Sequence, residues 1–71
     1  MEYIEVPENI NIDILIAKFG KEAVDFYQRR LAERERNGKL YPKRLKTIYI
    51  WATQDKKTNQ GFYSYLHFLL I

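Results

Sequence analysis

The sequence has no cysteine, so neither a disulfide nor a thiolate metal site can reinforce the fold. It has only three glycines, and they are too far apart to form a glycine-rich phosphate-binding loop. No apolar run approaches the ~20 residues that a membrane-spanning helix needs, and the N-terminus lacks the basic and apolar segments of a secretion signal. We therefore expect a cytoplasmic protein without a membrane partner and without a cofactor.

With 71 residues, the chain is long enough for one small domain over residues 1–71, in which a single core supplies only a few kcal/mol of net stability. Aromatic residues make up 15% of the chain, which is enough for aromatic packing to build much of that core. The remaining route to stability is self-association.

Charge is distributed unevenly along the chain. Residues 1–20 carry four acidic groups and one basic group, a net charge of −3, whereas residues 37–57 carry six basic groups and one acidic group, a net charge of +5. Such asymmetry is typical of a chain with one basic face that attracts a polyanion. A solvated surface with no partner explains the same pattern equally well.

Two helices are indicated before residue 39. The first, at about 11–19, has its apolar residues on one face, Asn11 as a potential N-cap and Gly20 as a stop. The second, at about 21–37, has an apolar stripe that includes Val24, Tyr27 and Leu31, and Gly38 lies just past its end. Their junction at Gly20 resembles the corner of a helix-turn-helix unit. The first ten residues are expected to form an extended arm or an edge strand.

The segment from about 43 to 56 has two possible structures. As a helix that begins near Pro42, it places Leu45, Ile48, Tyr49 and Ala52 on one face. As a strand, residues 46–53 are rich in β-branched and aromatic side chains and form a hairpin with residues 62–70, which makes the domain α+β. We favour the helix, because the hairpin requires a long loop. The predicted fold class is all-α, with three helices and a possible short fourth helix at the C-terminus. Its expected core residues are Ile12, Leu15, Ile16, Phe19, Val24, Tyr27, Leu31, Leu45, Ile48 and Ala52.

The sequence gives little support for catalysis. His67 is the single histidine, and no carboxylate lies within four residues of it. The acidic residues are scattered rather than grouped, which argues against a carboxylate pair or a metal site. We therefore predict that the chain is not an enzyme and that it binds no metal.

Binding of nucleic acid, with DNA as the expected partner, is the better-supported function. Basic residues at the end of the second helix are followed directly by those at the start of the third, and a helix N-terminus also presents free N–H groups to phosphate. Tyr41 lies among these cations, in a position to stack on a base or contact a sugar. Glu33 and Glu35 neutralise part of the cluster, and aromatic residues at helical spacing more often belong to a core. The candidate nucleic-acid-binding residues are Arg30, Arg34, Lys39, Tyr41, Lys43, Arg44 and Lys46.

Several of these residues also carry a resemblance to a known family. The order Leu15-Ile16-Ala-Lys-Phe-Gly20, a basic helix, Gly38-Lys-Leu-Tyr41 and Thr47-Ile48 with Trp51 resembles a segment near the C-terminus of phage and plasmid replication proteins related to the DnaD primosome family. It covers about residues 13–55. The resemblance implies a helical segment that contributes to DNA binding when DNA replication starts. The residues at matching positions are Lys39, Tyr41, Thr47, Ile48 and Trp51. The sequence departs from the family pattern at Phe19, Ile50 and the stretch Pro42-Lys43-Arg44.

The main alternative is a protein-interaction or assembly module. Residues 62–71 are apolar and carry no acidic or basic side chain apart from His67, and a chain this short has difficulty burying them alone. A homodimer or a protein partner would cover them. A further alternative is that the acidic residues Glu2, Glu5 and Glu8 fold back onto the basic surface and compete with DNA.

Overall fold

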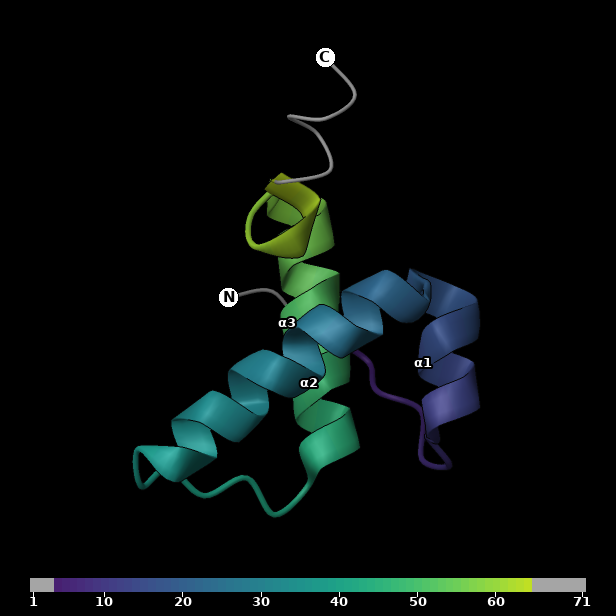
Figure 1. The fold of residues 1–71 in the computed structure, drawn as a ribbon. Coiled ribbons are helices and arrows are strands. Elements are labelled where there is room, and N and C mark those ends of the chain that lie inside the picture. The colour runs from purple at the N-terminus through teal and green to yellow at the C-terminus, as the bar shows by residue number, and fades with distance from the viewer. Residues whose placement is uncertain (1–3, 65–71) are drawn as a thin grey trace.

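The computed structural model describes residues 4–64, which fold into three α-helices (Figure 1). These are α1 (Ile12–Phe19), α2 (Lys21–Arg36) and α3 (Arg44–Thr58). Helix α2 crosses α3, and α1 lies beside the first half of α2. The part of the chain described contains no strand, so the all-α prediction is confirmed. The alternative hairpin is wrong, because residues 46–53 lie within α3.

Helix α1 begins at the predicted cap and ends at the predicted glycine. The Oδ1 atom of Asn11 accepts a hydrogen bond from the backbone N–H of Ile14 at 2.9 Å, which satisfies one of the free donors of the first turn. Gly20 adopts a φ of +91°, a conformation that L-residues with a side chain rarely adopt, and α2 starts at the next residue. Gly20 thus produces the sharp corner between the two helices.

Helix α2 ends in a Schellman motif that sets the direction of the following loop. Gly38 has a φ of +94°, its N–H donates to the carbonyl of Glu35 at 3.1 Å, and the N–H of Lys39 donates to the carbonyl of Arg34 at 3.1 Å. Pro42 lies just before α3 rather than in its first turn, because the helix begins at Arg44. The residues that follow the glycine therefore leave α2 in a defined direction.

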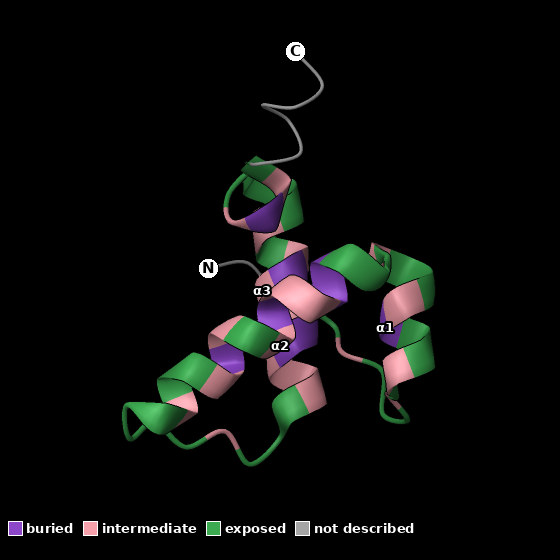
Figure 2. Cartoon of the chain, in the orientation of Figure 1, coloured by how far each residue is buried: buried purple, intermediate pink, exposed green. Residues whose placement is uncertain are grey.

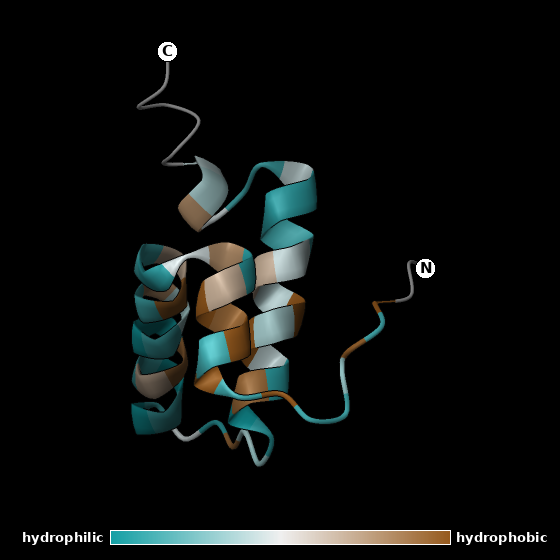
Figure 3. Ribbon diagram, turned by 90° about the vertical axis from the view of Figure 1, so that its right-hand side faces the viewer, coloured by the Kyte–Doolittle hydropathy of each residue, from teal (hydrophilic) through white to brown (hydrophobic). Residues whose placement is uncertain are grey.

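The core lies where the three helices meet. Figure 2 shows the buried positions on the facing sides of α2 and α3, and Figure 3 shows that hydrophobic residues gather between the helices while hydrophilic residues face outward. The side chains of Leu15, Tyr27 and Leu31 are fully buried. The buried residues are Leu15, Ala23, Val24, Tyr27, Leu31, Ile48, Tyr49, Ala52 and Phe62. Ile12, Ile16, Phe19 and Leu45, also expected in the core, are partly buried against it.

Both ends of the described chain add to this core. At the start, Ile4, Val6 and Ile10 pack against it from an arm that contains no strand. At the end, residues 62–64 form a helical turn in which Phe62 is 9% exposed and lies 5.6 Å from the ring of Phe26. The rest of the proposed fourth helix, and most of the segment expected to dimerise, lie outside the described residues. Dimerisation through residues 62–71 stays a prediction.

Within residues 4–64, no helix is both long and apolar enough to cross a bilayer.

Candidate nucleic-acid interface

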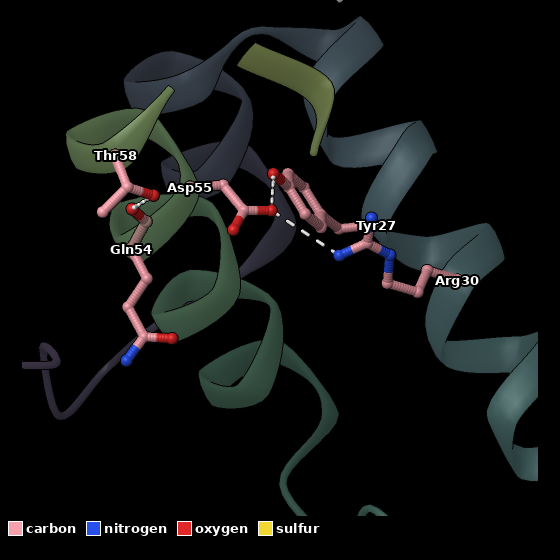
Figure 4. Close-up of polar contacts among 5 residues, drawn as sticks. All are labelled: Tyr27, Arg30, Gln54, Asp55 and Thr58. Carbon is pink, nitrogen blue, oxygen red and sulfur yellow. Dashed lines mark hydrogen bonds and ion pairs between the residues drawn. The ribbon is translucent and has the colours of Figure 1, made fainter. Parts of the chain in front are cut away.

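The candidate cations do not form one cluster, because the fold uses Arg30 internally. The Nη1 atom of Arg30 on α2 lies 3.5 Å from the Oδ2 atom of Asp55 on α3 (Figure 4). The Arg30 guanidinium also lies 5.0 Å from the centre of the Phe26 ring. The hydroxyl of Tyr27 donates to the same Asp55 oxygen at 2.6 Å. We call Tyr27, Arg30 and Asp55 the Asp55 cluster. It joins α2 to α3 and neutralises Arg30.

The Asp55 cluster also affects the pKa of nearby tyrosines and the space available at Gly61. Burial, together with the hydrogen bond to Asp55, raises the pKa of Tyr27 above the ordinary value of 10. Burial likewise raises the pKa of Tyr63, and the charge of Asp55 adds to the effect. Gly61 has a φ of +56°, and a Cβ atom there would collide with the Asp55 carboxylate. The turn after α3 therefore depends on a residue without a side chain. Within the last turn of α3, Thr58 donates its hydroxyl to the carbonyl of Gln54 at 2.9 Å (Figure 4).

Arg34 and Tyr41 meet on the ring of Trp51. The guanidinium of Arg34 lies 5.0 Å from the centre of that ring, which is a cation–π geometry. Tyr41 contacts Trp51 edge-on, with ring centres 5.4 Å apart and an interplanar angle of 80°. Tyr41 is therefore half-buried and packs against α3 through Trp51.

Arg44 is paired, but only at the surface. Its Nη2 atom lies 3.3 Å from the Oε1 atom of Glu35, and its side chain is 54% exposed. Exposed pairs of this kind contribute about 0–1 kcal/mol, so a phosphate can replace the carboxylate at little cost. Arg44 remains available to an anionic partner.

Three lysines differ from the arginines. Lys39 and Lys43 are exposed and Lys46 is half-buried, and none of their ammonium groups forms an ion pair or a hydrogen bond within residues 4–64. Lys43 and Lys46 lie at the N-terminus of α3, where no side chain caps the helix and the first turn contains no acidic residue, and Lys39 lies at the start of the loop, just after Gly38. We call Lys39, Lys43 and Lys46, together with Arg44, the loop-cation surface.

A shallow hollow of about 300 Å³ adjoins the loop-cation surface. It is lined by Lys43, Arg44, Leu45, Lys46 and Ile10, the last from the N-terminal arm. The arm therefore reaches the basic surface, as the self-screening alternative requires. Yet neither Glu5 nor Glu8 forms an ion pair within the described range, and Glu2 lies outside it. The residue of the arm that lines this hollow, Ile10, is apolar.

The counter-charges of Arg30 and Arg44 could not be predicted from the local sequence. Asp55 lies on a different helix from Arg30, and Glu35 lies nine residues before Arg44. No local sequence pattern predicts either pair. Reasoning from the sequence also overlooked Leu40, whose side chain is exposed even though it is large and apolar. Its position between Lys39 and Tyr41, next to a proline turn, was the available signal.

The described residues give no support for a metal site. The described residues contain no group of three or more histidine, cysteine, aspartate or glutamate side chains arranged to hold a metal ion, and His67 lies outside them. No family model, curated protein or solved structure matches the chain. The resemblance to replication proteins related to the DnaD primosome family therefore stays a prediction.

Proposed function

We propose that this domain binds DNA without catalysing a reaction, through the loop-cation surface. The observation that carries the proposal is that Lys43 and Lys46 lie at the N-terminus of α3, and Lys39 at the start of the loop before it, with no acidic partner among residues 4–64. Ammonium groups with no internal partner, next to backbone N–H groups at a helix start, suit phosphate oxygens.

The structure reduces the set of residues that we assign to the contact. Arg30 is neutralised by Asp55, and Arg34 lies over Trp51, so both contribute first to the fold. Arg44 joins the lysines because its pair with Glu35 is exposed. Tyr41 holds the loop against α3 by packing on Trp51. The proposed phosphate contacts are Lys39, Lys43, Arg44 and Lys46.

A link to the start of phage or plasmid replication is a narrower part of the proposal, and the sequence resemblance alone supports it. Such a role places the protein in the cytoplasm, where that DNA is replicated. Phosphate contacts give affinity and orientation but do not read sequence. The proposal therefore covers DNA binding without a stated sequence preference.

The salt dependence of binding tests the proposal. Neutralising four phosphates on a duplex gives a slope of log K against log salt concentration of about −3.6, so a fourfold rise in salt weakens binding about 150-fold. We expect the triple variant K39A/K43A/K46A to lose most of this slope in fluorescence-anisotropy titrations of labelled duplex and single-stranded DNA.

A matched variant separates the loop-cation surface from overall charge. K21A/R29A/K56A removes the same number of positive charges from positions outside the loop. Lys21 begins α2 and Lys56 lies near the end of α3, so both are at the helix ends that the loop does not join. We expect this control to retain the salt slope of the unmodified protein. Equal losses in the two variants would mean that net charge, rather than this surface, attracts DNA. The absence of binding in the unmodified protein would refute the proposed function.

A further inference from the structure

Leu40 is the most unusual exposed residue of the described chain. Its side chain is 90% exposed, whereas the other large apolar side chain that is exposed, Ile14 on α1, is only 37% exposed. Leaving a leucine in water forgoes about 1.5–3 kcal/mol of burial free energy. Single exposed apolar side chains are common on protein surfaces, so Leu40 becomes a candidate contact only together with its anchored backbone and the cations beside it.

The loop presents Leu40 in a fixed direction. On one side of it, the N–H of Lys39 is hydrogen-bonded to the carbonyl of Arg34 within the Schellman motif. On the other side, Tyr41 packs on Trp51, and Pro42 restricts the backbone of both itself and Tyr41. Because both neighbours of Leu40 are anchored, little backbone conformational entropy is lost when its side chain enters a partner.

The charges around Leu40 indicate what kind of partner this is. Lys39 and Lys43 flank it in the loop and have no acidic partner among the described residues. The centres of protein–protein interfaces are depleted in lysine, so this surrounding does not fit a protein contact. An anionic membrane attracts lysines too, but stable membrane binding requires a larger apolar face or a second anchor. A single apolar side chain between cations fits the wedges with which proteins enter the minor groove of duplex DNA.

We propose that Leu40 inserts between adjacent base pairs of duplex DNA while the loop-cation surface holds the flanking phosphates. This inference rests on the proposed function, since the cations must first bring the loop to the duplex. Insertion partly unstacks one base step and kinks the duplex. Steps that unstack easily, such as TA, and mismatched pairs lower the cost of insertion. The domain thus binds flexible or distorted sites more tightly than stiff A-tracts.

The experiment uses a duplex with 2-aminopurine beside a central TA step, because the fluorescence of this base rises when it is unstacked. We expect the unmodified protein to raise the fluorescence severalfold, and the L40M variant to do so as well, since methionine also serves as a wedge. L40A is expected to bind the same duplex up to about tenfold more weakly, a change of about 1.4 kcal/mol, and to raise the fluorescence little or not at all. I14A is the control, since it truncates the other exposed apolar side chain, and it should behave as the unmodified protein.

The outcomes separate this inference from the proposed function. Duplex binding by the unmodified protein without a rise in fluorescence, or an equal rise with L40A, overturns the wedge and leaves DNA binding intact. If the unmodified protein binds no DNA, both the wedge and the proposed function are overturned. Vesicles of phosphatidylcholine and phosphatidylserine test the membrane source of negative charge. If L40A abolishes vesicle binding and leaves the response of the duplex unchanged, Leu40 belongs to a membrane contact and the wedge is rejected.

Discussion

The boundary between α2 and α3 and the loop that joins these helices use positive charge in opposite ways. Along the boundary, Arg30 pairs with Asp55 and Arg34 lies over Trp51, so each guanidinium is part of the fold. In the loop, Lys39 and Lys43 have no acidic partner among the described residues. The planar, weakly hydrated guanidinium stacks and pairs well in partly buried places, whereas the ammonium group is strongly hydrated. The basic tract of the sequence is therefore two features, one that stabilises the fold and one that is available to a partner.

The largest expected difference between boundary and loop comes from truncating one leucine in each. L31A removes a fully buried side chain on α2 and leaves a cavity, so the free energy of unfolding should fall by about 3 kcal/mol. L40A, in the loop, should change it by no more than about 0.5 kcal/mol. Urea unfolding followed by circular dichroism measures both. Similar losses in the two variants would show that the loop is part of the core.

The next largest difference in stability is expected between two glycine-to-alanine variants, G61A beside the Asp55 cluster and G38A in the loop. G61A places a Cβ atom against Asp55 and Tyr27, so it should destabilise the fold by about 2 kcal/mol through strain and a lost hydrogen bond. G38A has a similar backbone constraint, but nothing lies within 4 Å of the added atom. It should cost only about 1 kcal/mol. Thermal unfolding of both variants tests this order, and a greater loss in G38A would contradict the crowding at Gly61.

Removing one hydroxyl tests the Asp55 cluster more gently. Y27F deletes the donor to Asp55 and should lower the free energy of unfolding at neutral pH by about 1 kcal/mol. The matched control is Y41F, because Tyr41 packs on Trp51 through its ring and its hydroxyl forms no hydrogen bond within residues 4–64. If Y41F is destabilised as much as Y27F, the hydrogen bond to Asp55 is not the cause.

Alkaline pH weakens the same cluster. The pKa of Tyr27 is higher in the folded protein than its ordinary value of 10, so the unfolded chain loses this proton first as the pH rises. The associated stability is fully present below about pH 10 and is lost as the pH rises toward the folded-state pKa, by at most about 1.4 kcal/mol per pH unit for each such tyrosine. Tyr63, whose pKa is also raised, adds to the loss. Urea titrations at increasing pH should show a shallower decline for Y27F than for the unmodified protein.

The smallest effect on stability is expected from the lysines of the loop. The K39A/K43A/K46A variant removes three ammonium groups that have no acidic partner in the described part of the chain, so the free energy of unfolding should change by no more than about 0.5 kcal/mol. DNA binding should nevertheless lose most of its salt dependence. A variant that binds DNA poorly because it is unfolded would show this in its circular dichroism spectrum.

The fold was largely predictable because its determinants are local. The cap at Asn11, the stop at Gly20 and the helical spacing of Ile48 and Ala52 act within a few residues, and the structure confirms each. The strand alternative rested on β-branched and aromatic content between 46 and 53, which is a weaker signal than burial against two neighbouring helices. The segment forms a helix because a helix buries Ile48, Tyr49 and Ala52 in the core together.

The candidate site was less predictable because its electrostatics depend on distant pairs. Whether Arg30 faces solvent depends on Asp55, which lies on another helix. Tyr41 was expected to contact nucleic acid, yet its packing depends on where α3 brings Trp51. Lys39, Lys43 and Lys46 could be named from the sequence, but the absence of an acidic partner within residues 4–64 is a property of the fold.

The contact of Trp51 with Arg34 and Tyr41 has a practical consequence for spectroscopy. Trp51 is the one tryptophan of the sequence, so excitation at the red edge of its absorption band observes a single site without labelling. That site is at the base of the loop that carries Leu40, where Arg34 and Tyr41 both touch the indole. A ligand that pulls on the loop changes the surroundings of the indole and therefore its emission wavelength and lifetime. The protein thus carries its own optical probe at the place where binding is proposed.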